Sequence, residues 1–135
     1  MSFSTNRMNK YIYYVIAVLF IAGVAWLIIT PGKAGKLDAF AQCIKDKGVT
    51  FYGAFWCPHC QAQKARFGVS SKYLPYVECS TPDSQGQTQV CKDANIATYP
   101  TWQFPAAPGA TTTTRITGEM ELVDLAEKTS CVLPE

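Results

Sequence analysis

The residues with the most evident chemistry are the six cysteines of this 135-residue chain, two of which form the motif Cys57-Pro58-His59-Cys60. Where such a pair begins a helix, unpaired backbone N–H groups and the helix dipole stabilise the thiolate of the first cysteine. A thiolate is both the attacking form of cysteine and the better leaving group. We therefore expect Cys57 to exchange disulfides with a substrate and Cys60 to resolve them. His59 adds a positive or hydrogen-bonding neighbour that makes the disulfide more oxidising, and Pro58 suits the first helical turn.

Two other uses of this motif are a zinc half-site and a purely structural disulfide. A zinc site needs further ligands at suitable spacing, whereas His59 is the single histidine of the chain and the sequence holds no second C-x-x-C. A structural disulfide rarely closes so tight a loop at the start of a helix. Redox catalysis is therefore the favoured interpretation.

Composition excludes one broad class of function. Apolar residues make up 48% of the chain and charged residues 16%, which indicates a hydrophobic segment rather than disorder. The formal net charge of +2 comes from Arg7 and Lys10, because acidic and basic residues balance in the rest of the chain. A neutral domain without basic runs lacks the electrostatic footprint of a nucleic-acid-binding protein.

An uncharged run from Tyr11 to Thr30, about twenty residues long, suffices to cross the hydrocarbon core of a membrane as a helix. Aromatic residues near both of its ends suit the two membrane interfaces. The alternatives are a buried core helix, which would show a polar face, and a cleavable signal peptide, whose apolar region is shorter. We expect an uncleaved anchor and this division of the chain: 1–10 N-terminal tail, 11–30 transmembrane signal-anchor, 31–36 linker, 37–135 one folded domain.

The side of the membrane follows from the cysteines. Basic residues flank both ends of the apolar run, so the charge bias for its orientation is slight. A small domain that reads as disulfide-rich is typical of an oxidising compartment. We expect a single-pass cell-membrane protein whose domain lies outside the cytoplasm, in the periplasm or on the outer face.

Hydrophobic periodicity predicts an α/β domain. The run at 49–56 is almost wholly apolar and ends at Cys57, which is typical of a central strand buried on both faces. Gly48 before it suits the end of a helix. The expected elements are helices at 37–47, 57–67, 84–94 and 119–128, strands at 76–80 and 110–117, and a turn leading into a strand at 96–102.

These residues resemble the thioredoxin superfamily. The resemblance rests on Phe55-Trp56-Cys57-Pro58-His59-Cys60 after a hydrophobic strand and on Tyr99-Pro100-Thr101 about forty residues later. It implies a thioredoxin-like fold over 37–135, with a central mixed sheet flanked by helices. It also implies that Pro100 is cis and that Tyr99 and Pro100 form a groove for a substrate peptide, with Trp56 as a wall.

A closer resemblance adds Tyr76-Val77-Glu78-Cys79 and Cys91-Lys92. With these, the chain is similar to the thioredoxin-like domain that partners, or is fused to, bacterial homologues of vitamin K epoxide reductase. The implied partner is a membrane enzyme that reoxidises the domain and passes electrons to a quinone. One departure is that the strand at 49–56 carries no acid, whereas cytosolic thioredoxins have one there. Glu78 is the nearest candidate for a proton relay, and a solvated glutamate at a strand end is the simpler interpretation.

The resemblance supports a structural disulfide between Cys79 and Cys91, and Cys43 and Cys131 then pair by elimination. Alternatives are free buried thiols at Cys43 and Cys131 and a shuttle role for the other pair.

The expected function is a cofactor-free, metal-free thiol–disulfide oxidoreductase that oxidises protein thiols outside the cytoplasm. Within the same chemistry, a disulfide reductase or isomerase is the alternative. A copper or zinc handling module is the alternative from another class.

Overall fold

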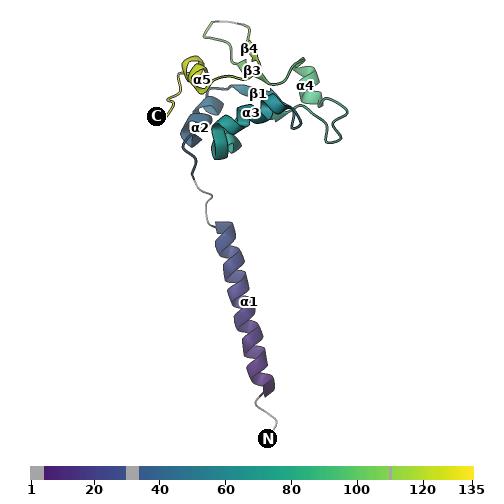
Figure 1. Cartoon of the computed structure of the whole chain (residues 1–135), viewed down its shortest axis with the longest axis vertical. Helices are drawn as coiled ribbons and strands as arrows, with labels where there is room; N and C mark the ends of the chain where they lie inside the picture. Colours follow the sequence, from purple (N-terminus) through teal and green to yellow (C-terminus); the bar gives the residue numbers. More distant parts are fainter. Residues whose placement is uncertain (1–4, 30–33, 110) are drawn as a thin grey trace. The chain divides into compact units, whose positions relative to one another are not determined.

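The computed structural model describes residues 5–29, 34–109 and 111–135 of the chain (Figure 1). The chain divides into two compact units, Met1–Lys33 and Ala34–Glu135. The second unit begins within the linker expected at 31–36, and residues 31–33 of that linker, like Thr30 of the expected span, lie outside the described residues.

The described residues of the first unit form one helix, α1 (Thr5–Ile29). Its apolar part, Lys10–Ile29, has a mean hydropathy of 2.6. A helix of this length and composition suits a membrane span, and an N-terminal signal sequence meets the same criterion.

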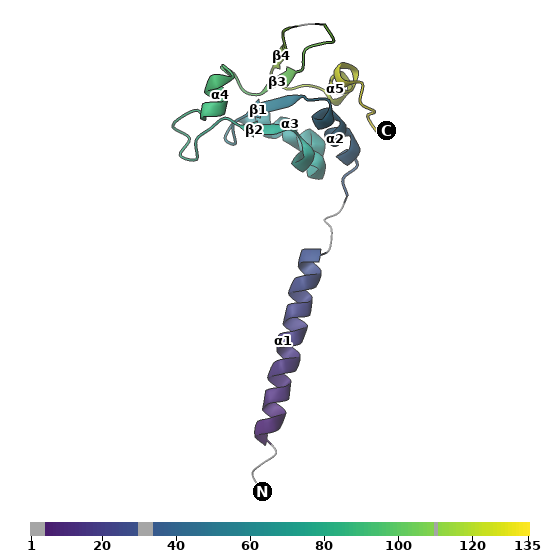
Figure 2. The same ribbon diagram turned by 180° about the vertical axis from the view of Figure 1, so that it is seen from behind.

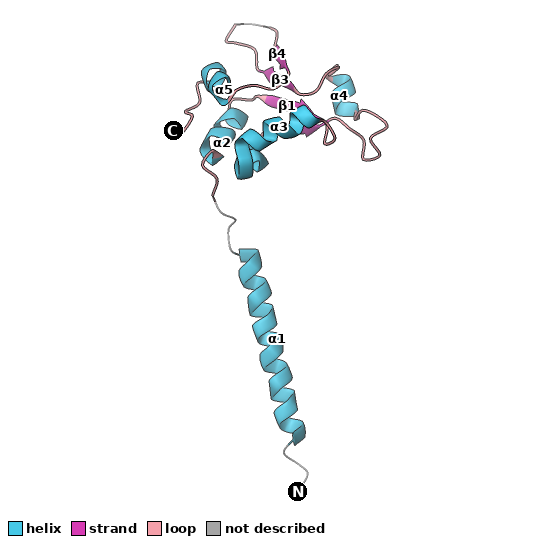
Figure 3. Cartoon of the chain, in the orientation of Figure 1, coloured by secondary structure: helices cyan, strands magenta, loops and turns pink. Residues whose placement is uncertain are grey.

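The second unit is built on a sheet of four strands, coloured magenta in Figure 3: β1 (Thr50–Gly53), β2 (Tyr76–Glu78), β3 (Thr101–Phe104) and β4 (Thr114–Thr117). Their order across the sheet is β2-β1-β3-β4. β1 pairs in parallel with β2 and antiparallel with β3, which pairs antiparallel with β4. The sheet is therefore mixed, and the α/β class expected from the sequence is confirmed.

Helices flank this sheet: α2 (Asp38–Asp46), α3 (Pro58–Phe67), α4 (Gln89–Asp93) and α5 (Leu122–Thr129), with a 3₁₀ turn η1 (Gly68–Tyr73) after α3. α2 and α3 lie side by side in both views (Figures 1 and 2). Phe40 of α2 stacks on Phe67 of α3 with ring centroids 5.9 Å apart. In the core behind them, Phe51 of β1 stacks on the fully buried Trp102 of β3 at 4.4 Å. All four rings belong to one buried core cluster, which also contains Cys57 and Cys60, and this shared core positions the start of α3.

Two expected elements are shorter than predicted near the cysteines. The strand expected at 49–56 ends at Gly53, because the backbone turns there and the N–H of Cys57 donates to the carbonyl of Ala54 at 3.0 Å. The helix expected at 84–94 shrinks to α4. Before it, short polar side chains bond to the local backbone instead, as when the N–H of Gly86 donates to the hydroxyl of Thr81.

Other boundaries shift for reasons of pairing. The strand expected at 110–117 begins at Thr114, because Thr114 pairs with Phe104, the last residue of β3. Ala110 lies outside the described residues. The helix expected at 119–128 begins at Leu122, because the backbone of Met120 bonds to the side chain of Gln63 instead. η1 lies in a stretch to which the sequence assigned no element.

Candidate active site

Cys57 lies at the junction of β1 and α3, as its position after the apolar run predicts. It is the N-cap residue of α3 and Pro58 occupies the first turn. Its carbonyl accepts a bond from the N–H of Gln61 at 3.1 Å, while the N–H groups of the first turn have no partner within the helix. Cys57 is 5% exposed. Its sulfur is therefore shielded from solvent and lies at the helix N-terminus, the positive end of the helix dipole.

Cys60 lies one turn further in and is 1% exposed. A Cβ atom at Gly53 would come within 2.9 Å of its sulfur, so glycine is needed at that position of β1. Burial, followed by the hydrogen bond with Cys57, raises the pKa of the Cys60 thiol to about 12. Neither cysteine is joined in a disulfide here. The pair therefore combines one sulfur at a helix end with one shielded, protonated thiol.

The loop before β3 brings Tyr99 and Pro100 to this pair. The peptide bond between them is cis, as the resemblance implies. The Cys57 thiol donates to the carbonyl oxygen of Tyr99 at a sulfur–oxygen distance of 3.8 Å. A main-chain acceptor thus lies beside the first thiol.

Aromatic side chains border the same place. Phe55 is 44% exposed and Trp56 is 51% exposed. The Trp56 ring meets Tyr99 edge-on at a centroid distance of 6.1 Å, and its N–H donates to the hydroxyl of Ser80 at 2.8 Å. Trp56 is therefore held in place although half of it faces solvent, as a wall of a binding surface requires.

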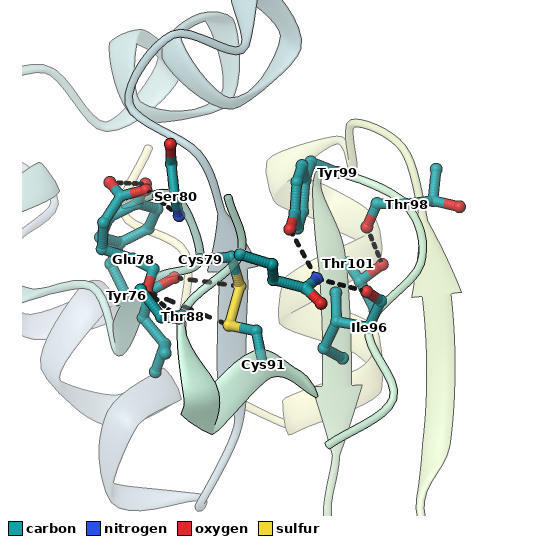
Figure 4. The surroundings of a disulfide bond; sticks show 12 residues. Tyr76, Glu78, Cys79, Ser80, Thr88, Cys91, Ile96, Thr98, Tyr99 and Thr101 are labelled. Carbon is teal, nitrogen blue, oxygen red and sulfur yellow. Dashed lines mark hydrogen bonds between the residues drawn. A yellow bond between two sulfur atoms is a disulfide. The ribbon is translucent and has the colours of Figure 1, made fainter. Parts of the chain in front are cut away.

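Glu78, the candidate for a proton relay, accepts hydrogen bonds from other groups of the protein, among them those of Tyr76 and Ser80 (Figure 4). Its carboxylate accepts bonds from the N–H of Phe55 at 3.2 Å, the N–H of Ser80 at 2.8 Å and the hydroxyl of Tyr76 at 2.7 Å. Burial, then this last bond, raises the pKa of the Tyr76 hydroxyl. Glu78 thus ties β2 to the loop that precedes Cys57, and a role as a proton relay stays a prediction.

The sequence analysis missed Lys64. Its ammonium lies 3.2 Å from the centre of the Tyr76 ring, and burial lowers the pKa of this ammonium. Lys64 stands four residues after Cys60 on α3, a spacing that places two side chains on one helix face. That spacing is the signal that could have identified it.

The sequence analysis also missed a set of contacts on another face of α3. His59 Nδ1 lies 2.8 Å from Glu119 Oε1, and Arg66 Nη2 lies 3.2 Å from Glu119 Oε2. Between them the fully buried Gln63 pairs with the backbone of Met120. No local pattern announces these contacts, because the partners are more than fifty residues apart.

The remaining cysteines form two disulfides in the structure. Cys79 and Cys91 are joined beside Ile96 (Figure 4), and Cys43 of α2 is joined to Cys131. These are the pairings that the sequence analysis expected. Among the described residues no group of three or more histidine, cysteine or acidic side chains is placed to hold a metal ion.

Comparison with known proteins agrees with this geometry. The chain is similar to "Thiol-disulfide oxidoreductase LTO1" of Arabidopsis thaliana, with 38% identity over 111 residues. This match covers 79% of the present chain and 28% of the relative, so the chain corresponds to only part of that protein. The thioredoxin family profile matches residues 35–130, a range that includes all the cysteines except Cys131 and also the loop with Tyr99 and Pro100. The chain belongs to the thioredoxin family.

Proposed function

We propose that this protein is a membrane-anchored thiol–disulfide oxidoreductase that oxidises protein thiols outside the cytoplasm. The observation that carries the proposal is the arrangement of Cys57, Cys60 and Tyr99. One thiol lies at a helix N-terminus and beside a main-chain acceptor, and the second is buried behind it. Thiol–disulfide exchange needs one reactive sulfur and one that stays shielded until a mixed disulfide has formed.

In the oxidising direction the protein starts with a Cys57–Cys60 disulfide. A substrate thiolate attacks the sulfur of Cys57, and Cys60 leaves and takes up a proton. A second substrate thiolate then attacks the substrate sulfur of this mixed disulfide, and Cys57 leaves as a thiolate. The substrate gains one disulfide, and two electrons end on the cysteine pair.

The roles of the neighbouring residues follow from their positions. Tyr99 offers main-chain groups against which an extended substrate peptide can pair, and Pro100, whose carbonyl is bonded to the N–H of Gly118, holds that backbone in place. Trp56 supplies an apolar wall, since half of its surface is open while its N–H is bonded to Ser80. His59, in the first turn of α3, supplies a positive or hydrogen-bonding neighbour that favours the reduced form of the pair.

Reoxidation needs an electron acceptor. By resemblance we assign this role to a quinone-linked membrane enzyme similar to vitamin K epoxide reductase. The apolar helix α1 supports the assignment, because as an anchor it would keep the domain close to such an enzyme. The two disulfides outside the motif support a location outside the cytoplasm, where structural disulfides persist.

The reduction potential of the Cys57–Cys60 pair tests the direction of electron flow. The full-length chain in detergent is equilibrated with glutathione buffers, and the free thiols are alkylated and counted by mass spectrometry. We expect a reduction potential of about −120 mV, which is typical of a strongly oxidising enzyme of this type. A potential of about −270 mV, as in thioredoxin, would contradict the oxidising role and favour a reductase.

A trapping experiment tests the partner. The Cys60→Ser variant of the full-length chain is expressed in its own host and mixed disulfides are isolated under non-reducing conditions. We expect a multi-pass membrane enzyme among them, and the Cys57→Ser variant should capture none. Recovery of soluble substrates alone would contradict the membrane partner.

A further inference from the structure

One face of α3 holds a segment that follows β4. His59, Gln63 and Arg66 stand at positions i, i+4 and i+7, so their side chains project from the same side of the helix. Gln63 donates to the carbonyl of Met120 at 3.1 Å and accepts from its N–H at 2.6 Å. His59 and Arg66 contact Glu119 on either side of this buried pairing.

The same segment is bonded to the loop that carries Pro100. The N–H of Gly118 donates to the carbonyl of Pro100 at 2.8 Å. Glu119 therefore lies between two fixed points, with the proline loop on one side and the buried Gln63–Met120 pairing on the other. Its side chain is 26% exposed, whereas that of His59 is 72% exposed. The carboxylate is thus the better-fixed member of the pair and determines where the imidazole lies.

We propose that Glu119 is a positioning residue that holds the imidazole of His59, a residue of the Cys57–Cys60 motif, and through it makes the Cys57–Cys60 disulfide more oxidising. The inference rests on the proposed oxidoreductase function and deepens it. His59 Nδ1 lies 2.8 Å from Glu119 Oε1, a distance at which a carboxylate and a histidine ring form a charge-assisted hydrogen bond. A positive charge near Cys57 stabilises the thiolate that reduction releases, and stabilising the reduced form makes the disulfide a stronger oxidant.

The charge of Glu119 could also act on Cys57 directly, with the opposite sign. A negative carboxylate disfavours a nearby thiolate, so this effect alone would make the disulfide less oxidising. The pKa of the Glu119 carboxyl is lowered, first by its hydrogen bond with His59 and then by that with Arg66. It is therefore ionised at neutral pH. Whether removal of this charge makes reduction of the disulfide less or more favourable distinguishes an effect through His59 from a direct effect on Cys57.

The test uses the full-length chain in detergent at pH 7, in redox equilibrium with glutathione. In Glu119→Gln we expect the equilibrium constant for reduction by glutathione to fall about threefold, the size of an exposed ion pair, or about 14 mV at about 30 mV per tenfold. Glu121→Gln is the matched control. Glu121 undergoes the same change two residues later and contacts Arg66 but not His59, so this variant should match the wild type.

A double-mutant cycle with His59→Asn decides whether the effect passes through the imidazole. If it does, Glu119→Gln changes nothing in the His59→Asn background. An increase of the equilibrium constant, a wild-type value in Glu119→Gln, or an effect that persists without His59 would each overturn the inference. Should Glu119→Gln fail to fold, a wild-type equilibrium constant in His59→Asn would overturn it instead.

The outcome for the wild type separates this inference from the function on which it rests. If the wild-type pair exchanges with glutathione and Glu119→Gln does not differ from it, only the inference fails. If the wild-type pair does not exchange at all, the oxidoreductase proposal fails, and the inference fails with it.

Discussion

The thiol of Cys57 lies 3.8 Å from the carbonyl oxygen of Tyr99, a residue forty-two positions later in the chain. This contact joins the start of α3 to the loop before β3, and no local interaction produces it. Cys57 follows β1 and Tyr99 precedes β3, and because these two strands pair with each other, the sheet brings the two residues together. The first thiol therefore lies next to the main chain against which a substrate would pair.

Replacing either cysteine of the motif should give opposite results. Cys60→Ser leaves Cys57 unable to be resolved, so mixed disulfides with a reduced, unfolded substrate protein should accumulate. Cys57→Ser leaves only the buried thiol, which is 1% exposed and should form none. Non-reducing gel electrophoresis with full-length protein measures both. Equal trapping by the two variants would contradict the assignment of Cys57 as the attacking sulfur.

The reactivity of Cys60 should depend steeply on pH. Burial, the largest cause of its raised pKa of about 12, remains when Cys57 is replaced by alanine. A thiol with a raised pKa stays protonated at neutral pH, so in Cys57→Ala its alkylation rate should rise about tenfold per pH unit from about pH 7 to 10. The same variant in guanidinium chloride is the control, and its rate should level off above about pH 8.5. A plateau below about pH 9 in the folded protein would contradict the prediction.

Gln63 should matter for stability more than any exposed glutamine. Gln63→Leu keeps the volume roughly constant but leaves the buried N–H and carbonyl of Met120 without their partner. We expect a loss of about 2–4 kcal/mol in the free energy of unfolding of the domain, measured by urea denaturation. Gln85→Leu, at an exposed position, should change stability by less than about 0.5 kcal/mol. Similar losses in both variants would show that the pairing contributes little.

The two disulfides should contribute unequally. Their cysteines are 88 residues apart for Cys43–Cys131 and 12 apart for Cys79–Cys91. Chain entropy alone assigns about 4.6 and about 2.8 kcal/mol to such loops. When each disulfide is removed by replacing both of its cysteines with serine, loss of Cys43–Cys131 should therefore lower the thermal unfolding temperature of the domain more than loss of Cys79–Cys91. The Cys79→Ser, Cys91→Ser variant should also retain thiol–disulfide exchange activity when folded, and loss of that activity would favour a shuttle role for this pair.

Much of the fold was predictable because its signals are local. The run at 49–56 identified the central strand, since few elements other than a buried strand are apolar on both faces and end abruptly. Element ends were less predictable, because they depend on distant partners. The helix expected from residue 119 begins at Leu122 because Gln63, more than fifty residues earlier, binds the backbone of Met120.

The candidate site divides in the same way. Cys57, Cys60, His59 and Pro58 were visible in the sequence because they lie within one turn of a helix. Glu119 and Gly118 were not visible, because their roles depend on contacts made across the fold.

By itself the sequence determined the chemistry of this protein and the type of its elements, including the apolar N-terminal helix. Those properties follow from residue type, short spacing and hydrophobic periodicity, which are all local. Only the tertiary structure decided which side chains pair around the motif, such as Lys64 over Tyr76 and Glu119 against His59. The physical reason is that such contacts arise from strand pairing and helix packing, which bring together residues with no fixed separation along the chain.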